Sequence, residues 1–141
     1  DCEGSSFLVS NQCFRVYRDS KRSWKDAQQR CAEEGMIIAE PKDPSALRRY
    51  LIDNNMVAGI SGNFFWLGGR GNGINMVWNT SQQVFPASDP SWYRDHPGDR
   101  VTANHCLSML VRSSVFSSGS PSTPYRASDC TWPFHTICQH Q

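Results

Sequence analysis

The sequence has no excess of charge of one sign and no long hydrophobic run. Its 14 basic and 13 acidic residues give a net charge of +1, so no broad field of one sign attracts nucleic acid or an anionic membrane. No apolar run approaches the roughly 20 residues that a transmembrane helix needs. We therefore expect neither nucleic acid as a partner nor insertion into a membrane.

Common catalytic motifs are also absent. The chain has no Gly-x-Ser-x-Gly elbow, no His-Glu-x-x-His motif and no glycine loop that would hold a phosphate. Loose Ser, His and Asp residues occur in almost any chain of this length and do not by themselves indicate a catalytic triad. The sequence therefore predicts a protein that is not an enzyme.

What the chain does have is an even set of six cysteines. None lies in a CxxC pair or beside a pair of histidines with zinc-finger spacing, so three disulfides are the simplest interpretation. Disulfides persist in oxidising compartments, and we expect a secreted protein or the extracellular domain of a larger one. The start at Asp1-Cys2, with no signal peptide, indicates a mature protein or an excised domain. Asn79-Thr80-Ser81 is a glycosylation sequon. Asn79 either carries a glycan or belongs to a tripeptide that arose by chance, and the sequence leaves both alternatives open.

The first half of the chain shows the patterns of a hairpin and two amphipathic helices. Ser and Asp are favoured N-caps, Pro is favoured at the first helical position, and Gly commonly ends a helix. In chain order we expect a hairpin in residues 2–19, a helix that Ser23 caps and Gly35 ends, a short strand at 36–39, and a helix from Asp43-Pro44 to about Asn54.

The second half changes to strands and loops. Two regions lack a regular apolar pattern, namely a long loop region at 78–106 and a Ser-rich insertion at 113–124. The expected strands are Phe64–Gly69, Met76–Trp78, Cys106–Val111 and a closing strand at 131–138 with Pro133 at an edge or bulge. With 141 residues the chain should form a single α+β domain, residues 1–141.

The places of the tryptophans indicate core positions. Trp24, Trp66, Trp78 and Trp132 lie on the expected helix stripe or strands, and we expect all four to be buried. Arg48-Arg49 is interpreted as the solvated face of the second helix.

One stretch, Trp92–Cys106, gathers carboxylates, imidazoles, an amide and an indole around a Pro97-Gly98 turn. Loops of this kind on a rigid scaffold often carry binding groups. Trp92 either packs beneath the loop or contacts a ligand, and we favour packing; Tyr93 and Arg94 are the better contact candidates. His96 and His105 with Asp95 and Asp99 could bind zinc, but solvated loop residues are the favoured interpretation.

Taken together, the pattern resembles the C-type lectin-like domain family in its long form. The matching features are Cys31 on a first helix, a second helix, Trp66-Leu67-Gly68-Gly69 where the family carries Trp-Ile-Gly-Leu, and the closing cysteines. The resemblance implies two helices packed on twisted, mostly antiparallel sheets with a long loop region. It also implies the disulfides Cys2 with Cys13, Cys31 with Cys138, and Cys106 with Cys130.

Sugar-binding members of that family hold a calcium ion with carboxylate and amide oxygens. The resemblance places His96-Pro97-Gly98 at the family's Glu-Pro-Asn position, with a probable cis proline, and Asn104 at a Glu position. Its Asn-Asp pair falls on Arg126 and Ala127. Calcium prefers oxygen ligands, whereas histidine supplies nitrogen and glycine supplies no side chain. We therefore expect no cofactor.

The expected function is extracellular recognition of a protein, or of a glycan bound without the family's usual calcium site. A calcium-dependent lectin whose site has shifted to Asp99 or Asp129, with Asp95 and Asp99 also available for an auxiliary ion, is one alternative. A structural ice- or mineral-binding role is another, although no regularly spaced Thr supports it. The candidate ligand-binding residues are Tyr93, Arg94, Asp95, His96, Asp99, Asn104 and Arg126.

Overall fold

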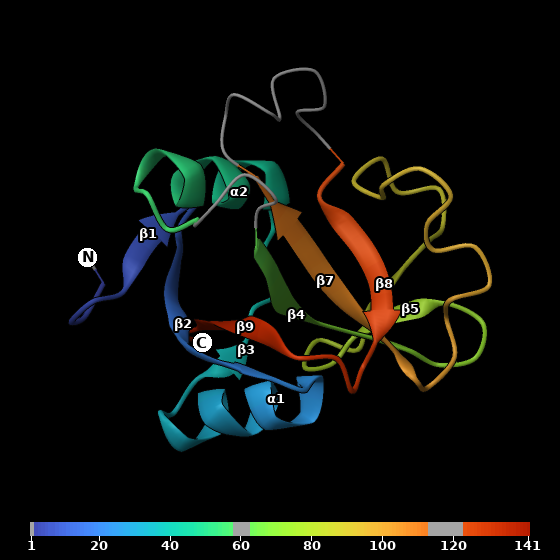
Figure 1. Cartoon of the computed structure of the whole chain (residues 1–141), viewed down its shortest axis with the longest axis horizontal. Coiled ribbons are helices and arrows are strands. Elements are labelled where there is room, and N and C mark those ends of the chain that lie inside the picture. The colour runs from blue at the N-terminus through green and yellow to red at the C-terminus, as the bar shows by residue number, and fades with distance from the viewer. Residues whose placement is uncertain (1, 58–62, 113–122) are drawn as a thin grey trace.

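The computed structural model describes residues 2–57, 63–112 and 123–141. Within these ranges the chain forms two helices and nine strands (Figure 1). In chain order they are β1 (Phe7–Val9), β2 (Gln12–Arg22), α1 (Trp24–Glu33), β3 (Ile37–Ile38), α2 (Pro44–Asp53), β4 (Asn63–Gly71), β5 (Met76–Trp78), β6 (Val84–Phe85), β7 (His105–Val111), β8 (Tyr125–Asp129) and β9 (Phe134–Gln139).

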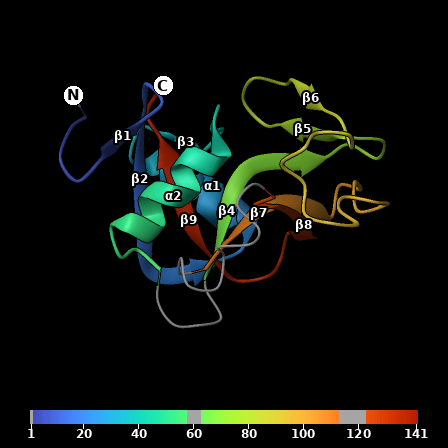
Figure 2. The same ribbon diagram turned by 90° about the horizontal axis from the view of Figure 1, so that it is seen from above.

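The strands pair in the order β1-β2-β9-β4-β5-β6, with β7 joining β4 to β8 and β3 pairing with β9. Among the described strands β4 and β9 are the one parallel pair. Helices α1 and α2 lie on opposite sides of β2, β9 and β4, and the chain between β5 and β7 projects from the end away from both termini (Figures 1 and 2). The predicted α+β architecture with mostly antiparallel strands and a long loop region is confirmed.

Both helices begin at the residues that their capping chemistry indicates. The Ser23 hydroxyl accepts a hydrogen bond from the Asp26 N–H at 3.3 Å, and the Asp43 carboxylate accepts one from the Ala46 N–H at 3.0 Å. Each bond satisfies a backbone donor that the first turn would otherwise leave free. Helix α1 gives way to Gly35, whose φ of +73° suits glycine.

All six cysteines pair as the resemblance implied. Cys2 with Cys13 closes the N-terminal hairpin, Cys31 with Cys138 joins α1 to β9, and Cys106 with Cys130 joins the start of β7 to the end of β8. The last bond ties the two strands together at one end of the β7–β8 pair, which carries part of the candidate site.

Two clusters of buried side chains lie beneath this framework. Trp66 is fully buried, and its indole N–H donates to the Arg22 carbonyl at 2.7 Å. Trp24 is buried as expected, with its indole N–H donating to the Leu67 carbonyl at 2.8 Å. Trp78 is half-buried and packs against the larger cluster.

The expected burial of Trp132 is wrong, because its side chain is 52% exposed. Trp132 lies in the turn between β8 and β9, where its backbone N–H donates to the Asp129 carbonyl at 3.0 Å. Strand β9 begins only after Pro133, at Phe134. The side chains of a strand alternate between its two faces, but a turn residue does not follow this alternation. The hydrophobicity of Trp132 was therefore not enough to predict its burial.

Arg48 also differs from its expected place on a solvated face, since it is 8% exposed while Arg49 is exposed. On α2, Arg48 stands three residues before Leu51 and four after Pro44, so it shares their side of the helix. Burial, followed by the charge of Arg49, lowers the pKa of the Arg48 guanidinium. Of the expected Ser-rich insertion at 113–124, residues 113–122 lie outside the described residues.

Candidate ligand-binding surface

Strand β8 and the long loop region are brought together by backbone hydrogen bonds. Trp92 and Tyr125 form a parallel bridge, in which the Tyr125 N–H donates to the Ser91 carbonyl at 3.0 Å. The Tyr93 N–H in turn donates to the Tyr125 carbonyl at 2.9 Å. The loop segment 91–93 therefore runs beside β8, and its side chains meet those of a strand more than thirty residues further along the chain.

Arg126 is the charged centre of this junction. Its guanidinium carbon lies 3.8 Å from the centroid of the Tyr93 ring and 6.0 Å from that of Phe64. Burial is the largest influence on its pKa and lowers it, but a guanidinium remains protonated in proteins. Its Nε–H is buried without a hydrogen-bond partner in the described part of the chain. Contact with aromatic faces therefore holds much of this cation in place.

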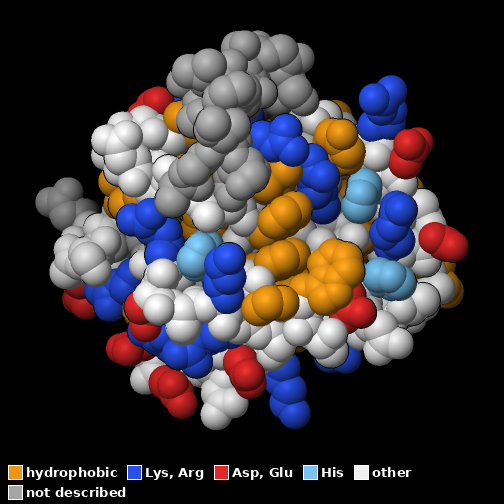
Figure 3. Space-filling model, in the orientation of Figure 1, with side chains coloured by type: hydrophobic (Ala, Val, Ile, Leu, Met, Phe, Trp, Pro, Cys, Tyr) orange, Lys and Arg blue, Asp and Glu red, His pale blue; other side chains and the backbone are white. Residues whose placement is uncertain are grey.

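A row of aromatic side chains continues from Arg126 across the face. Phe64 stacks on Phe134 with ring centroids 4.7 Å apart, and Trp132 meets Phe134 edge-on at 6.2 Å. Hydrophobic side chains gather near the middle of Figure 3, with Lys, Arg and His side chains around them. We call the surface formed by Phe64, Tyr93, His96, Arg126, Trp132 and Phe134 the cationic surface.

His96 joins the loop to β8. Its Nδ1 accepts a hydrogen bond from the Ala127 N–H at 3.0 Å, which places the ring proton on Nε2. Its ring centroid lies 5.9 Å from that of Tyr93, and the His96-Pro97 peptide bond is cis, as expected. Burial, then the charges of Arg100 and Arg126, lowers the pKa of His96 against an opposing effect of Asp95. The imidazole is therefore mainly neutral at pH 7.

These groups do not fit the calcium ion that the resemblance would place here. The lone pair of His96 Nδ1 is already engaged by a backbone N–H, Gly98 has no side chain, and a guanidinium and a methyl group stand at 126 and 127. Among the residues that the structure describes, no three His, Cys, Asp or Glu side chains are grouped so that they could hold a metal ion.

Asp129, one of the two residues that a shifted calcium site could recruit, has local partners. One carboxylate oxygen accepts hydrogen bonds from both the backbone N–H and the hydroxyl of Thr131, at 2.9 and 2.7 Å. These bonds lower the pKa of the Asp129 carboxyl. His105 is likewise engaged locally, with Nδ1 2.8 Å from the Thr102 hydroxyl. Both side chains therefore support the turn structure around Cys106 and Cys130.

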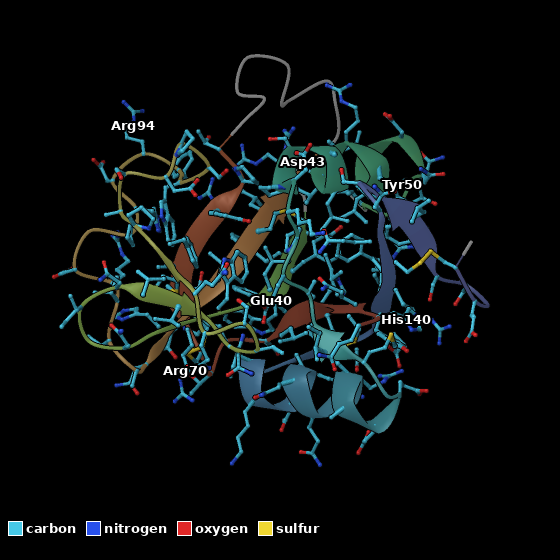
Figure 4. All side chains as sticks on the ribbon, turned by 180° about the vertical axis from the view of Figure 1, so that it is seen from behind. Glu40, Asp43, Tyr50, Arg70, Arg94 and His140 are labelled. Atoms are coloured by element: carbon cyan, nitrogen blue, oxygen red, sulfur yellow. A yellow bond between two sulfur atoms is a disulfide. The ribbon has the colours of Figure 1, made fainter. Side chains whose placement is uncertain are left out.

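The structure brings Tyr93, His96 and Arg126 together, and of the other candidates Asp95 is near enough to His96 to raise its pKa. Arg94 points away from the body of the molecule (Figure 4). Asp95, Asp99 and Asn104 are exposed, and within the described ranges no side-chain hydrogen bond or ring contact joins Arg94 or any of these three to the group. The Asp95 carbonyl accepts a hydrogen bond from Arg100 at 3.0 Å, which closes the loop around Pro97.

Trp92 packs beneath the loop, as favoured. It is 6% exposed, its ring stacks on Phe85 at 5.4 Å, and its indole N–H donates to the Pro86 carbonyl at 3.2 Å. The sequon residue Asn79 is half-buried in the turn after β5, and its glycosylation stays a prediction.

Three aromatic members of the surface were missed from the sequence, namely Phe64, Phe134 and Trp132. Alternation along β4 turns Phe64 outward and Phe65 inward, but an uninterrupted apolar run conceals which position faces solvent. The Trp132-Pro133 dipeptide was the available signal, because a proline restricts the residue before it and commonly precedes or follows a strand.

The chain has the C-type lectin fold, in the form with three disulfides. Neither a protein-family model nor a curated protein sequence matches it. Solved structures do match over nearly the full length, at low sequence identity.

One such structure is the C-type lectin domain of murine dendritic cell inhibitory receptor 2 in complex with an N-glycan, with 17% identity, coverage of 100% of this chain and 99% of that one, and a TM-score of 0.73. Human lithostathine matches with 16% identity, coverage of 100% and 91%, and a TM-score of 0.73. A calcium-independent type II antifreeze protein matches with 19% identity, coverage of 99% and 93%, and a TM-score of 0.70. One of these structures thus contains an N-glycan and another is called an antifreeze protein, so the shared fold does not identify a ligand.

Proposed function

We propose that the protein is an extracellular recognition module whose cationic surface binds a protein or a glycan by direct side-chain contacts, without calcium. The observation that carries this proposal is the Arg126 guanidinium, 3.8 Å from the Tyr93 ring, at a position where the resemblance would place a calcium ligand. A fixed cation can form charge-assisted hydrogen bonds with carboxylate, sulfate or phosphate groups.

The shape and composition of the surface support contact with a macromolecule. Aromatic and arginine side chains contribute most at binding hot spots, and Trp132, Phe134, Phe64, Arg126 and Tyr93 form one continuous row of that kind. Arg100 belongs to the same loop, where its guanidinium donates a hydrogen bond to the Asp95 carbonyl. The surplus of cations favours a ligand with negative charge, such as an acidic protein segment or an anionic glycan.

Three disulfides favour an oxidising location, which supports the extracellular assignment. Neither helix in the described ranges has the length and hydrophobicity to cross a membrane.

The direct test is a glycan array and a panel of extracellular proteins, probed with calcium and again with a chelator. We expect binding that is unchanged by the chelator and weakened by salt. Arg126→Ala and Trp132→Ala should each reduce affinity by about tenfold or more, as expected for hot-spot residues. Arg49→Ala, an exposed arginine on α2, is the matched control and should bind as wild type.

The calcium-dependent alternative has its own decisive measurement, a calorimetric titration with calcium. Saturable binding that Asp99→Ala abolishes, together with ligand binding that needs calcium, would overturn the proposal. Chelator-resistant binding that Arg126→Ala and Trp132→Ala leave intact would place the ligand elsewhere on the fold.

A further inference from the structure

A cavity of about 430 Å³ opens on another side of the molecule, where the start of α2, the turn after β5 and the first residue of β8 meet. Its volume lies within the range of small-molecule sites, roughly 300–1,000 Å³. The residues that matter are Glu40, Lys42, Trp78, Phe85, Asp89 and Tyr125, and we call this cavity the acidic pocket. Glu40 lies near the middle of the view from behind, and Asp43 lies above it, at α2 (Figure 4).

Aromatic rings form one wall of the acidic pocket. Trp78 stacks on Phe85 with centroids 4.7 Å apart, and Tyr125 meets Trp78 edge-on at 6.1 Å and Phe85 at 5.8 Å. These contacts fix the rings before any ligand arrives. An apolar group that enters the pocket therefore meets a rigid surface.

The Tyr125 hydroxyl is the polar group at this wall. The side chain is 3% exposed and lines the pocket, but its hydroxyl is not among the buried polar atoms that lack a partner in the described ranges. Burial, then the negative charges of Asp89 and Asp43, raises the pKa of Tyr125. The hydroxyl is therefore neutral at pH 7 and lies in a negative potential that two separate elements create.

Two carboxylates line the pocket, and a third, Asp43, is close enough for its charge to act on Tyr125; backbone N–H groups hold each one in place. Glu40 accepts hydrogen bonds from the Thr80 and Ser81 N–H groups at 2.7 and 3.3 Å. Asp89 accepts one from the Ser91 N–H at 2.9 Å, and Asp43 caps α2. Such bonds leave other oxygen lone pairs free to accept from a ligand.

None of the three carboxylates has a cationic partner. In the described ranges the one ion pair joins Arg30 to Asp19 at 3.2 Å, on another side of the fold. Lys42 lines the pocket but pairs with none of them. The carboxylates are also too dispersed to hold a metal ion among the described residues. Glu40 and Asp89 thus outnumber the one cation of the lining, Lys42, and the pocket keeps a net negative charge.

We propose that the acidic pocket binds an organic cation, an ammonium or guanidinium group with an apolar stem. The stem packs on Trp78 and Phe85, and the N–H groups donate to Glu40, Asp89 and the Tyr125 hydroxyl. A cation near aromatic rings gains further from their electron-rich faces. The same charge repels anions, and a neutral polyol gains nothing from it. The cation is either a free amine or a Lys or Arg side chain of a partner.

The test uses the whole chain in a nuclear magnetic resonance titration with butylammonium and butylguanidinium. We expect saturable shifts of the Trp78 indole N–H and of the Thr80, Ser81 and Ser91 amides. Butanol, with the same stem and no charge, and a methyl glucoside should shift these signals at least roughly fivefold less at equal concentration. Equal effects of a cation and a neutral probe would overturn the proposal.

Two variants locate the binding. Asp89→Asn keeps an oxygen that can accept from Ser91 and should weaken butylammonium binding roughly fivefold; Tyr125→Phe keeps the ring and should weaken it roughly threefold. Asp53→Asn, the same change of charge at the far end of α2, is the control and should leave binding unchanged. If Asp89→Asn binds like Asp53→Asn, the proposal is wrong.

A capped tripeptide Gly-Lys-Gly separates the two sources of the cation. Tighter binding of the peptide than of butylammonium indicates a partner side chain, and weaker binding indicates a free amine. The result does not depend on the cationic surface, because that surface shares no residue with the acidic pocket. Arg126→Ala should leave butylammonium binding unchanged, so failure of one proposal is distinguishable from failure of the other.

Discussion

Tyr125 and Arg126 are consecutive residues of β8, yet they contribute to two different surfaces. Tyr125 is 3% exposed and lines the acidic pocket, whereas Arg126 lies 3.8 Å from the Tyr93 ring on the cationic surface. Successive side chains of a strand point to opposite faces, so one short strand serves both. Each surface combines aromatic rings with charge, but the sign of the charge is opposite.

The two surfaces also differ in how their charges are held. On the cationic surface a side-chain cation rests on aromatic rings, and one of its own N–H groups is left without a partner. In the acidic pocket backbone N–H groups position the carboxylates, and the Tyr125 ring packs on Trp78 and Phe85. Substitutions that remove packing should therefore lower the free energy of unfolding more at the acidic pocket. Substitutions that remove charge should lower it more at the cationic surface.

The largest effect is expected from Tyr125→Ala. Its ring packs on Trp78, Phe85 and Trp92, so truncation leaves a cavity in the larger cluster. Loss of a buried aromatic side chain costs about 3–5 kcal/mol. Chemical denaturation followed by tryptophan fluorescence measures this free energy of unfolding. A cost below that of Arg126→Ala would contradict the view that Tyr125 belongs to the core and Arg126 to the surface.

Arg126→Ala comes next and should lower the free energy of unfolding by about 1 kcal/mol, since cation–π contacts are worth roughly 0.5–1 kcal/mol each where the cation is partly exposed. Arg126→Lys keeps the charge but lacks the planar group that stacks on a ring, and it should restore only part of the loss. Arg94→Ala, an exposed neighbour on the loop, is the control for stability and should change nothing measurable. Full rescue by lysine would show that charge alone matters.

Local patterns predicted the framework of the fold well. Ser23 and Asp43 cap the helices because their side chains bond to N–H groups three residues away, a relationship visible within a few residues of sequence. The disulfides came from the resemblance, and the structure confirms all three pairings. Helix caps can be predicted from residues a few positions apart, and the disulfide pairings can be predicted from a family pattern.

The candidate site was only partly predictable, because it is assembled across long distances in the chain. Strand β8 was not expected, since Arg126, Ser128 and Asp129 make it polar and its loop partner lies more than thirty residues upstream. His96 and Arg126 were chosen by correspondence with a family, and Tyr93 was chosen as an aromatic contact residue of the loop. Phe64 and Trp132 needed the observed burial and turn. The acidic pocket joins five separate segments and left no local pattern to find.

Acid should affect the cationic surface through His96. The folded-state pKa of His96 is lowered, so its contribution to stability is fully present above the unfolded value of about 6.5 and is lost as the pH falls through the folded value. Protonated His96 cannot accept from the Ala127 N–H, and the loss should approach about 1 kcal/mol.

Unfolding measured between pH 7.5 and 4.5 should therefore show a steeper decline for wild type than for His96→Asn, which keeps an acceptor but does not titrate. His135, whose pKa burial also lowers, remains in both proteins and cancels in the difference. Parallel curves would contradict the assigned role of Nδ1. Tyr125, whose pKa is raised, stays neutral throughout this range.

The smallest effect is expected from Tyr125→Phe, and it is the sharpest test of the difference between the two faces. The substitution removes only the hydroxyl and keeps every ring contact. Because the proposal assigns this hydroxyl to the ligand and not to a partner in the protein, the free energy of unfolding should stay within about 0.5 kcal/mol of wild type. A loss of about 1 kcal/mol or more would mean that the hydroxyl already has a partner in the folded protein. An unchanged stability together with weaker butylammonium binding would mean that the hydroxyl serves the ligand and not the fold.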